Sequence, residues 1–158
     1  MVCVKATNVD SEQPSSGEGI SSLAQGVIWL VVATRKRQFL VAIVDDDAGV
    51  RAAIQSLLES SGFRCWGFAS AEQFLRSRQG TRAACLILDV RLRGMSGLQL
   101  HSALQAKGLT IPVIFVTAED DAKTQLSQAP ALAILRKPFD PEELIRLVRL
   151  AAEPRGTH

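Results

Sequence analysis

The sequence predicts an α/β doubly wound fold, in which a parallel five-stranded sheet lies between layers of helices. Three observations support this prediction. Short apolar runs alternate with segments of helical period over residues 39–152. Most helical segments carry recognisable start and stop residues. The chain shows no internal repeat, and its 158 residues suit one such domain plus an extension.

Five apolar runs are the predicted strands, and they cover residues 39–44, 63–68, 83–88, 111–116 and 131–135. Strands of a parallel sheet that is covered on both faces are expected to be nearly continuous apolar runs. Trp66 and Phe68 are therefore predicted to be core residues. Cys65 and Cys85 also lie in apolar runs and are predicted to be plain buried cysteines. The three cysteines of the chain have neither disulfide-framework nor zinc-site spacing.

The first two helices are marked by capping residues. Asp47 can cap a helix whose apolar face recurs at helical spacing until Gly62 ends it. Ser70 and Gln73 form a capping-box pattern, which predicts a second helix that reaches about Arg78.

The remaining three helices differ in strength. Residues 97–107 carry a less regular apolar stripe, and His101 within it is predicted to be exposed to solvent because no partner stands at metal or base spacing. Residues 119–128 predict at most a short helix. Asp140 followed by Pro141 is a strong helix start, with a capping side chain and proline at the first helical position.

The ends of the chain predict the domain organisation. Residues 1–38 are expected to form a disordered extension, because much of this stretch is polar and rich in Ser and Gly. Residues 39–152 form the predicted domain, and residues 153–158 a tail. Since only this tail follows the last helix, we expect no output domain. Residues 27–33 form an apolar run too short to span a membrane, and no signal peptide is indicated, which favours the cytoplasm.

The charge of the chain is nearly balanced. There are 18 Lys and Arg residues against 16 Asp and Glu residues, and the formal net charge is +2. This balance argues against a large field of one sign that would hold nucleic acid. Direct contact with nucleic acid or with a membrane is therefore not expected.

Polar residues stand where the predicted strands end. Asp45 and Asp46 end the first strand, Asp89 the third, Thr117 the fourth and Lys137 the fifth. The carboxyl ends of parallel strands meet at one edge of the sheet, which is where ligands bind in this fold class. Carboxylates that converge there repel one another unless a cation compensates. Because magnesium prefers oxygen ligands, Asp45, Asp46 and Asp89 predict a Mg²⁺ site.

The same residues suit phosphoryl transfer. An aspartate can attack phosphorus and form an acyl phosphate. Such a transfer mainly requires in-line positioning and compensation of charge on the three equatorial oxygens. Magnesium can hold one oxygen, Lys137 a second and the hydroxyl of Thr117 a third. Asp89 is the predicted acceptor.

Four segments resemble the CheY-like receiver domains of two-component response regulators, in particular those of the FixJ type. They read VAIVDDD (41–47), LILDVRLRGMSGLQL (86–100), VIFVTAE (113–119) and LRKPFD (135–140). The resemblance covers about residues 39–152, in order and with family-like spacing. It implies a flavodoxin-like three-layer α/β/α sandwich with strand order 2-1-3-4-5.

The resemblance also implies roles for residues. Asp89 would accept a phosphoryl group from a sensor histidine kinase or a phosphotransfer protein. The backbone carbonyl of Arg91 would complete the metal site with Asp45 and Asp46. Such a domain signals through a downstream protein partner or a homodimer and is not an enzyme in the usual sense. The Lys137–Pro138 bond is cis in the family pattern.

Three departures from the family pattern stand out. Arg93 occupies a position where the family usually has proline, which either loosens the loop after Asp89 or adds a positive contact. Ile134 occupies a position where the family usually has an aromatic residue that moves with Thr117 on activation. The segment between Thr117 and Lys137 is about two residues short of the family pattern. These departures put the usual activation switch in question.

Two alternatives belong to other functional classes. Asp45 and Asp47 have the D-x-D spacing of haloacid-dehalogenase-type phosphatases. However, Gly49 stands where that motif wants Thr or Val, and Asp89 would have no role. The second alternative is a receiver-like binding module that acts without phosphorylation, which Ile134 and the short segment suggest.

Overall fold

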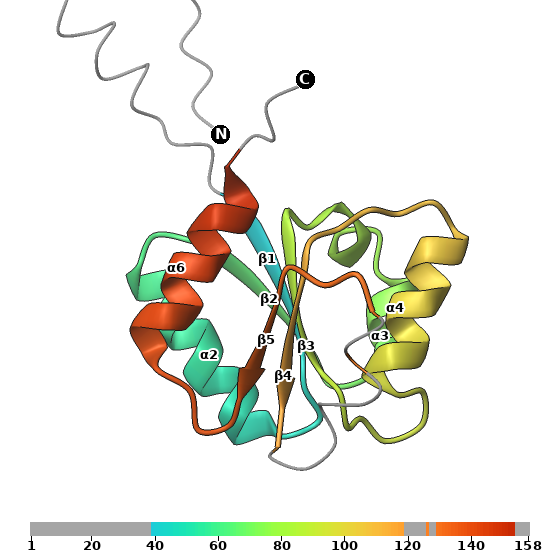
Figure 1. Cartoon of the computed structure of the whole chain (residues 1–158), viewed down its shortest axis with the longest axis horizontal. Coiled ribbons are helices and arrows are strands. Elements are labelled where there is room, and N and C mark those ends of the chain that lie inside the picture. Colours follow the sequence, from blue (N-terminus) through green and yellow to red (C-terminus); the bar gives the residue numbers. More distant parts are fainter. Residues whose placement is uncertain (1–38, 119–125, 127–128, 154–158) are drawn as a thin grey trace, which may run out of the picture. The chain divides into compact units, whose positions relative to one another are not determined.

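The computed structural model describes residues 39–118, 126 and 129–153, all within the compact unit Gln38–His158. Five parallel strands form one sheet in the order β2-β1-β3-β4-β5 (Figure 1). The strands are β1 (Leu40–Val44), β2 (Arg64–Phe68), β3 (Cys85–Asp89), β4 (Val113–Thr117) and β5 (Ala133–Arg136). The predicted fold class and strand order are confirmed.

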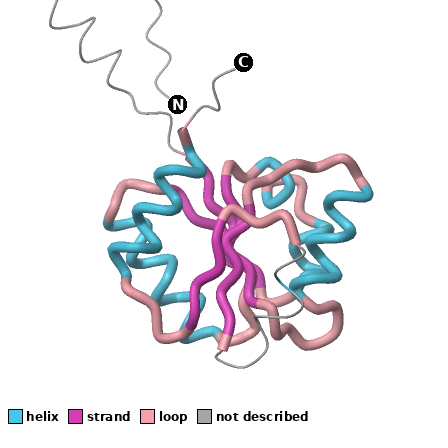
Figure 2. The backbone as a smooth tube through the Cα atoms, viewed as in Figure 1, coloured by secondary structure: helices cyan, strands magenta, loops and turns pink. Residues whose placement is uncertain are grey.

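Helices cover both faces of the sheet (Figures 1 and 2). The described residues form α2 (Ala48–Ser60), α3 (Ala71–Arg76), α4 (Gly97–Ala106), α6 (Pro141–Ala152) and a short 3₁₀ helix, η1 (Gly80–Arg82). Helices α2 and α6 lie on one side of the sheet, and α3 and α4 on the other. The helix predicted over residues 119–128 falls outside the described residues, apart from the buried Leu126.

Two hydrophobic clusters, one on each face of the sheet, make up the core. The first includes side chains from the α3 and α4 side: Ala42, Val44, Phe68, Phe74, Leu86, Leu88, Leu100, Leu104 and Phe115. The second includes side chains from the α2 and α6 side: Val41, Ile43, Ile54, Leu58, Ile87, Ile114, Leu144 and Val148. Successive residues of β1 and β3 alternate between the clusters, as the period of two in a strand requires.

Capping side chains fix the start of each of the four described α-helices. Asp47 accepts hydrogen bonds from the backbone N–H groups of Gly49 and Val50, and Asp140 accepts one from Glu142. Ser70 accepts the predicted bond from Gln73 N–H, but the side chain of Gln73 reaches Ala69 N–H. The full reciprocal capping box, which the sequence analysis missed, joins Ser96 and Gln99 at the start of α4.

Two predictions about side-chain burial were wrong. His101 is buried, with 6% of its surface exposed, because α4 packs Gly97, Leu100, His101 and Leu104 inward at helical spacing. Its ring packs edge-on against Phe115 at 5.5 Å between centroids. Trp66 is 38% exposed because β2 is an edge strand.

Other sequence predictions differ by smaller amounts. Cys85 is buried as predicted, whereas Cys65 on the edge strand is only half-buried. Helix α3 ends at Arg76 rather than Arg78, because Ser77 adopts an extended backbone conformation. The Lys137–Pro138 bond is cis. Within the described residues, none of the helices has the length and apolar character needed to cross a membrane.

Candidate functional site

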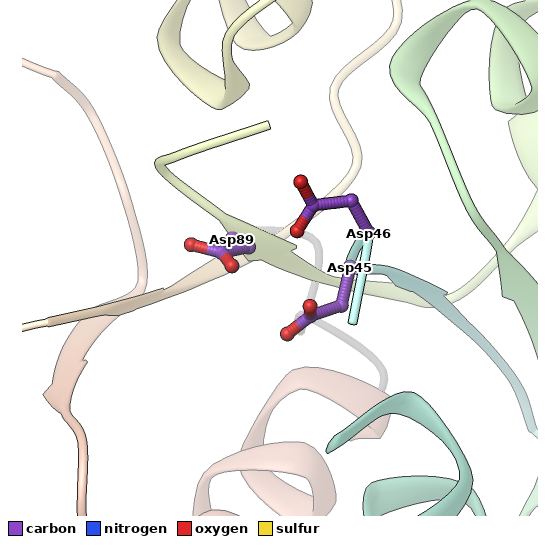
Figure 3. A group of neighbouring side chains, drawn as sticks. All are labelled: Asp45, Asp46 and Asp89. Atoms are coloured by element: carbon purple, nitrogen blue, oxygen red, sulfur yellow. The ribbon is translucent and has the colours of Figure 1, made fainter. Parts of the chain in front are cut away.

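Three carboxylates converge at the carboxyl edge of the sheet (Figure 3). Asp45 and Asp46 follow β1, and Asp89 is the last residue of β3. One oxygen of each group lies within 4.8 Å of one oxygen of each of the others. Asp45 and Asp89 are buried, with 2% and 7% of their surface exposed, whereas Asp46 is exposed. The structure thus brings together the three acids that the sequence places at the strand ends.

Lys137 bridges the two buried acids. Its ammonium nitrogen lies 3.1 Å from Oδ2 of Asp45 and 3.2 Å from Oδ2 of Asp89. The lysine directly follows β5, and its backbone N–H donates to the carbonyl of Thr117 at 2.8 Å. The bridge therefore joins residues that follow or end three different strands.

Burial and charge act in opposite directions at this bridge. Burial raises the pKa of Asp89, and the nearby Asp45 carboxylate adds to the rise, against the bond from Arg91 N–H and the attraction of Lys137. Burial alone lowers the pKa of Lys137, but its attraction to Asp89 and its bonds with Asp45 outweigh burial and raise it. The lysine is consequently held charged between two acids.

An arginine of α2 supports the turn that carries Asp45. The guanidinium of Arg51 donates to the carbonyl oxygen of Asp45 at 2.6 Å. Its side chain passes over Gly67 of β2, where a Cβ atom would lie 3.0 Å from Cδ of Arg51. The Oδ1 atom of Asp45 also accepts from Asp47 N–H at 2.9 Å. Arg51 was not predicted from the sequence, although a glycine inside a strand, such as Gly67, is a known sign that another group approaches closely.

The loop between β3 and α4 folds back on Asp89. The N–H of Arg91 donates to Oδ1 of Asp89 at 3.0 Å, and Gly97 N–H donates to the carbonyl of Val90 at 3.0 Å. A Cβ atom at Gly97 would overlap the carbonyl oxygen of Asp89. Arg93, which stands at the position of the usual proline, adds a positive contact, because its Nε lies 3.8 Å from Oδ2 of Asp46.

Thr117 lies at the same edge of the sheet and is completely buried. Its hydroxyl donates to the carbonyl oxygen of Ala118 at 3.0 Å. Ile134, by contrast, is 39% exposed on the edge strand β5. Thr117 is thus in the predicted place, with its hydroxyl engaged by backbone.

The donor set fits a hard divalent cation. All three converging groups offer carboxylate oxygens, which magnesium and calcium prefer over nitrogen or sulfur. The side chains of Lys137 and Arg93 supply positive charge to the cluster in the described structure. Aspartates, a lysine and a hydroxyl at one sheet edge are the groups that phosphoryl transfer to a carboxylate requires.

Comparison with known proteins decides the family. Residues 41–149 match the response regulator receiver domain. The chain belongs to this family. It is therefore a signalling domain of the kind found in two-component systems, with a CheY-like fold, and the FixJ-type resemblance is confirmed. These matches support the receiver hypothesis and not the phosphatase alternative.

Two curated relatives illustrate the match. The transcriptional regulatory protein TdiR of Thauera aromatica is 37% identical over 113 residues, which are 70% of this chain and 50% of TdiR. The transcriptional regulatory protein FixJ of Azorhizobium caulinodans is 37% identical over 111 residues, which are 69% of this chain and 53% of FixJ. The chain thus spans about half the length of these relatives.

A solved structure agrees with the fold. The crystal structure of FixJ-N is 30% identical in sequence, with a TM-score of 0.68, and the match covers 77% of this chain and 99% of that one. The backbone of the described domain is therefore similar to that of FixJ-N.

Proposed function

We propose that Asp89 accepts a phosphoryl group from the histidine of a sensor kinase or a phosphotransfer protein. The observation that carries this proposal is the bridge of Lys137 between Asp45 and Asp89 at 3.1 and 3.2 Å, because it places a fixed cation beside the acceptor oxygen. Membership in the receiver family supports the same assignment.

The proposed transfer uses residues at the sheet edge. An oxygen of Asp89 attacks phosphorus, the new O–P bond forms, and the P–N bond to the donor histidine breaks. The released imidazole nitrogen keeps the electron pair and takes up a proton from solvent. Lys137 then pairs with a phosphoryl oxygen, and Thr117 holds another once its hydroxyl leaves the carbonyl of Ala118.

The proposed cofactor is Mg²⁺, held by Asp45, Asp46, Asp89 and the backbone carbonyl of Arg91. When bound, such an ion neutralises charge that develops on the phosphoryl oxygens. The convergence of three carboxylates within 4.8 Å supports this assignment. Asp46, the exposed member, faces the loop that contains Arg93.

We further propose that residues 39–152 form the receiver, preceded by an extension and followed by a tail, and that it works in the cytoplasm. Its output would pass to a downstream protein partner or through a homodimer rather than by its own contact with nucleic acid. TdiR and FixJ carry the names of transcriptional regulators, and the chain matches only about half of each.

The test is incubation with Mg²⁺ and acetyl phosphate, followed by intact-protein mass spectrometry. We expect one added phosphoryl group, absent in Asp89→Asn. Asp47→Asn is the matched control, because Asp47 caps α2 and is not one of the three clustered acids. A wild-type protein that never gains mass would instead support the phosphorylation-independent binding module. Steady phosphate release that needs Asp45 but not Asp89 would support the phosphatase.

A further inference from the structure

The loop that follows Asp89 is hydrogen-bonded to helix α3, which contributes no residue to the carboxylate cluster. The backbone N–H of Met95 donates to Oε1 of Glu72 at 2.9 Å, and the two residues are 23 positions apart in sequence. Glu72 lies in the first turn of α3. The bond therefore joins α3 to the C-terminal part of the connection between β3 and α4.

The loop backbone is shaped around this carboxylate. Gly94 has a φ of +78°, a left-handed conformation that glycine adopts without strain. A Cβ atom at Gly94 would lie 2.8 Å from Oε1 of Glu72, which shows how closely the chain passes the acid. The bond from Met95 N–H is also the largest cause of the lowered pKa of Glu72, so the acceptor is held as a carboxylate.

The fastened segment carries groups of the candidate site. Arg91 N–H bonds to Asp89, and Arg93 lies immediately before Gly94 and pairs with Asp46. Gly97 N–H then returns to the carbonyl of Val90, so the loop is short and closed. Any displacement at Met95 is consequently passed to the segment that borders the acids.

We propose that Glu72 is a positioning residue for the metal and phosphoryl site, acting through the backbone of Gly94 and Met95. This inference rests on the proposed function, because it concerns how well that site binds a divalent cation and accepts a phosphoryl group. Glu72 itself touches neither the carboxylate cluster nor the acceptor in this assignment. Outer contacts of this kind commonly tune metal affinity by orienting the inner groups.

The test compares Glu72→Ala and Glu72→Gln with Glu142→Ala. Glu142 is an exposed acid at the same position in the first turn of α6, so its variant removes the same favourable interaction with a helix N-terminus without touching the loop. Mn²⁺ binding is measured by titration calorimetry, and the rate of labelling by acetyl phosphate is measured by mass spectrometry. Each variant is also melted, which separates a general loss of stability from a change at the site.

We expect Glu72→Ala to weaken Mn²⁺ binding and to slow labelling by about 3-fold to 10-fold. This is the size of effect expected when one hydrogen bond that orients the site is lost. Glu72→Gln keeps an oxygen that accepts from Met95 N–H, so it should return both values to within about 2-fold of wild type. Glu142→Ala should change neither. A Glu72→Ala variant that melts earlier but binds and reacts as wild type would overturn the proposal, as would a Gln variant that behaves like Ala.

Amide hydrogen exchange separates this inference from the proposed function. If wild type binds no Mn²⁺ and takes no phosphoryl group, the proposed function is wrong and the positioning role falls with it. In that case, the exchange rate of the Met95 amide still tests whether the hydrogen bond between Met95 and Glu72 forms. Faster exchange of the Met95 amide in Glu72→Ala than in Glu72→Gln would show that the hydrogen bond forms and has only a structural role. Equal exchange in the two variants would show that the bond to Met95 is not made.

Discussion

Lys137 and Asp89 are 48 positions apart in sequence, yet the ammonium nitrogen of the lysine lies 3.2 Å from Oδ2 of the aspartate. The same nitrogen lies 3.1 Å from Oδ2 of Asp45. Both carboxylates are buried, and the side chain of Lys137 is 26% exposed. A single cation therefore offsets two buried negative charges in the described structure.

Replacing Lys137 with methionine should destabilise the metal-free protein by about 1 to 3 kcal/mol, because two buried acids then lack their cation. Urea unfolding in EDTA measures this loss. Lys107→Met, at the exposed C-terminal cap of α4, is the control and should be nearly neutral. Addition of Mg²⁺ should stabilise the Lys137 variant more than wild type. Equal unfolding midpoints for the two variants in EDTA would contradict the bridge.

Replacing Asp89 with asparagine should have the opposite effect on stability. Burial raises the pKa of Asp89, which means that the charged form is unfavourable in the folded state. A neutral amide of the same shape should raise the melting temperature in EDTA by at least about 2 °C. Mg²⁺ should then stabilise wild type but not the variant. An Asp89→Asn protein that melts below wild type in EDTA would speak against this account.

His101 should make stability depend on pH. Burial lowers its pKa from the ordinary value of 6.5, against the opposing effect of a hydrogen bond with the backbone of Pro130. A histidine with a depressed folded pKa gives stability that is present above the unfolded pKa and is lost as the pH falls through the folded pKa. Unfolding free energy should therefore drop between about pH 7 and about pH 5. In His101→Gln, which keeps a hydrogen-bond donor, this pH-dependent drop in unfolding free energy should be smaller. Curves of unfolding free energy against pH that run parallel for the two proteins would refute the role of His101.

Arg93 should compete with a divalent cation for Asp46. Its Nε lies 3.8 Å from Oδ2 of Asp46, and its side chain is 96% exposed. Because exposed ion pairs are weak, Arg93→Ala should tighten Mn²⁺ binding only about 2-fold to 5-fold. This gain in affinity should be smaller at high salt, which screens the ion pair. Arg82→Ala, at an exposed position of the 3₁₀ helix η1, should leave the affinity unchanged. Weaker binding in Arg93→Ala would mean that Arg93 helps to build the site instead.

The sequence predicted the sheet and its acidic edge because both depend on local pattern and chain order. Apolar runs identify strands, and the parallel arrangement brings Asp45 and Asp89 to one edge. Each predicted strand began one or two residues early, since the apolar runs extend beyond the strands at their N-terminal ends, as Phe39 does before β1. Helix starts were equally local, as Asp47 shows.

What the sequence did not predict depends on contacts between distant elements. Glu72 and Met95 are 23 positions apart, and no local pattern reports their hydrogen bond. Trp66 is exposed because β2 lies at the edge of the sheet, which the composition of β2 does not reveal. The burial of His101 is different, because the spacing from Leu100 to Leu104 contained the signal. His101 was predicted to be exposed only because it has no metal-binding or catalytic partner in the sequence, and this reasoning ignored the apolar spacing around it.

The alternation of core residues along β1 and β3 has a consequence for the acids at their ends. Ile43 packs toward α2 and α6, whereas its neighbour Val44 packs toward α3 and α4. The strand ends that carry Asp45 and Asp89 are accordingly held by packing on both faces of the sheet, in addition to the loop contacts described above. If Asp89 accepts a phosphoryl group as proposed, a cavity created in either cluster should shift these strand ends and change the rate of labelling, even far from the acids.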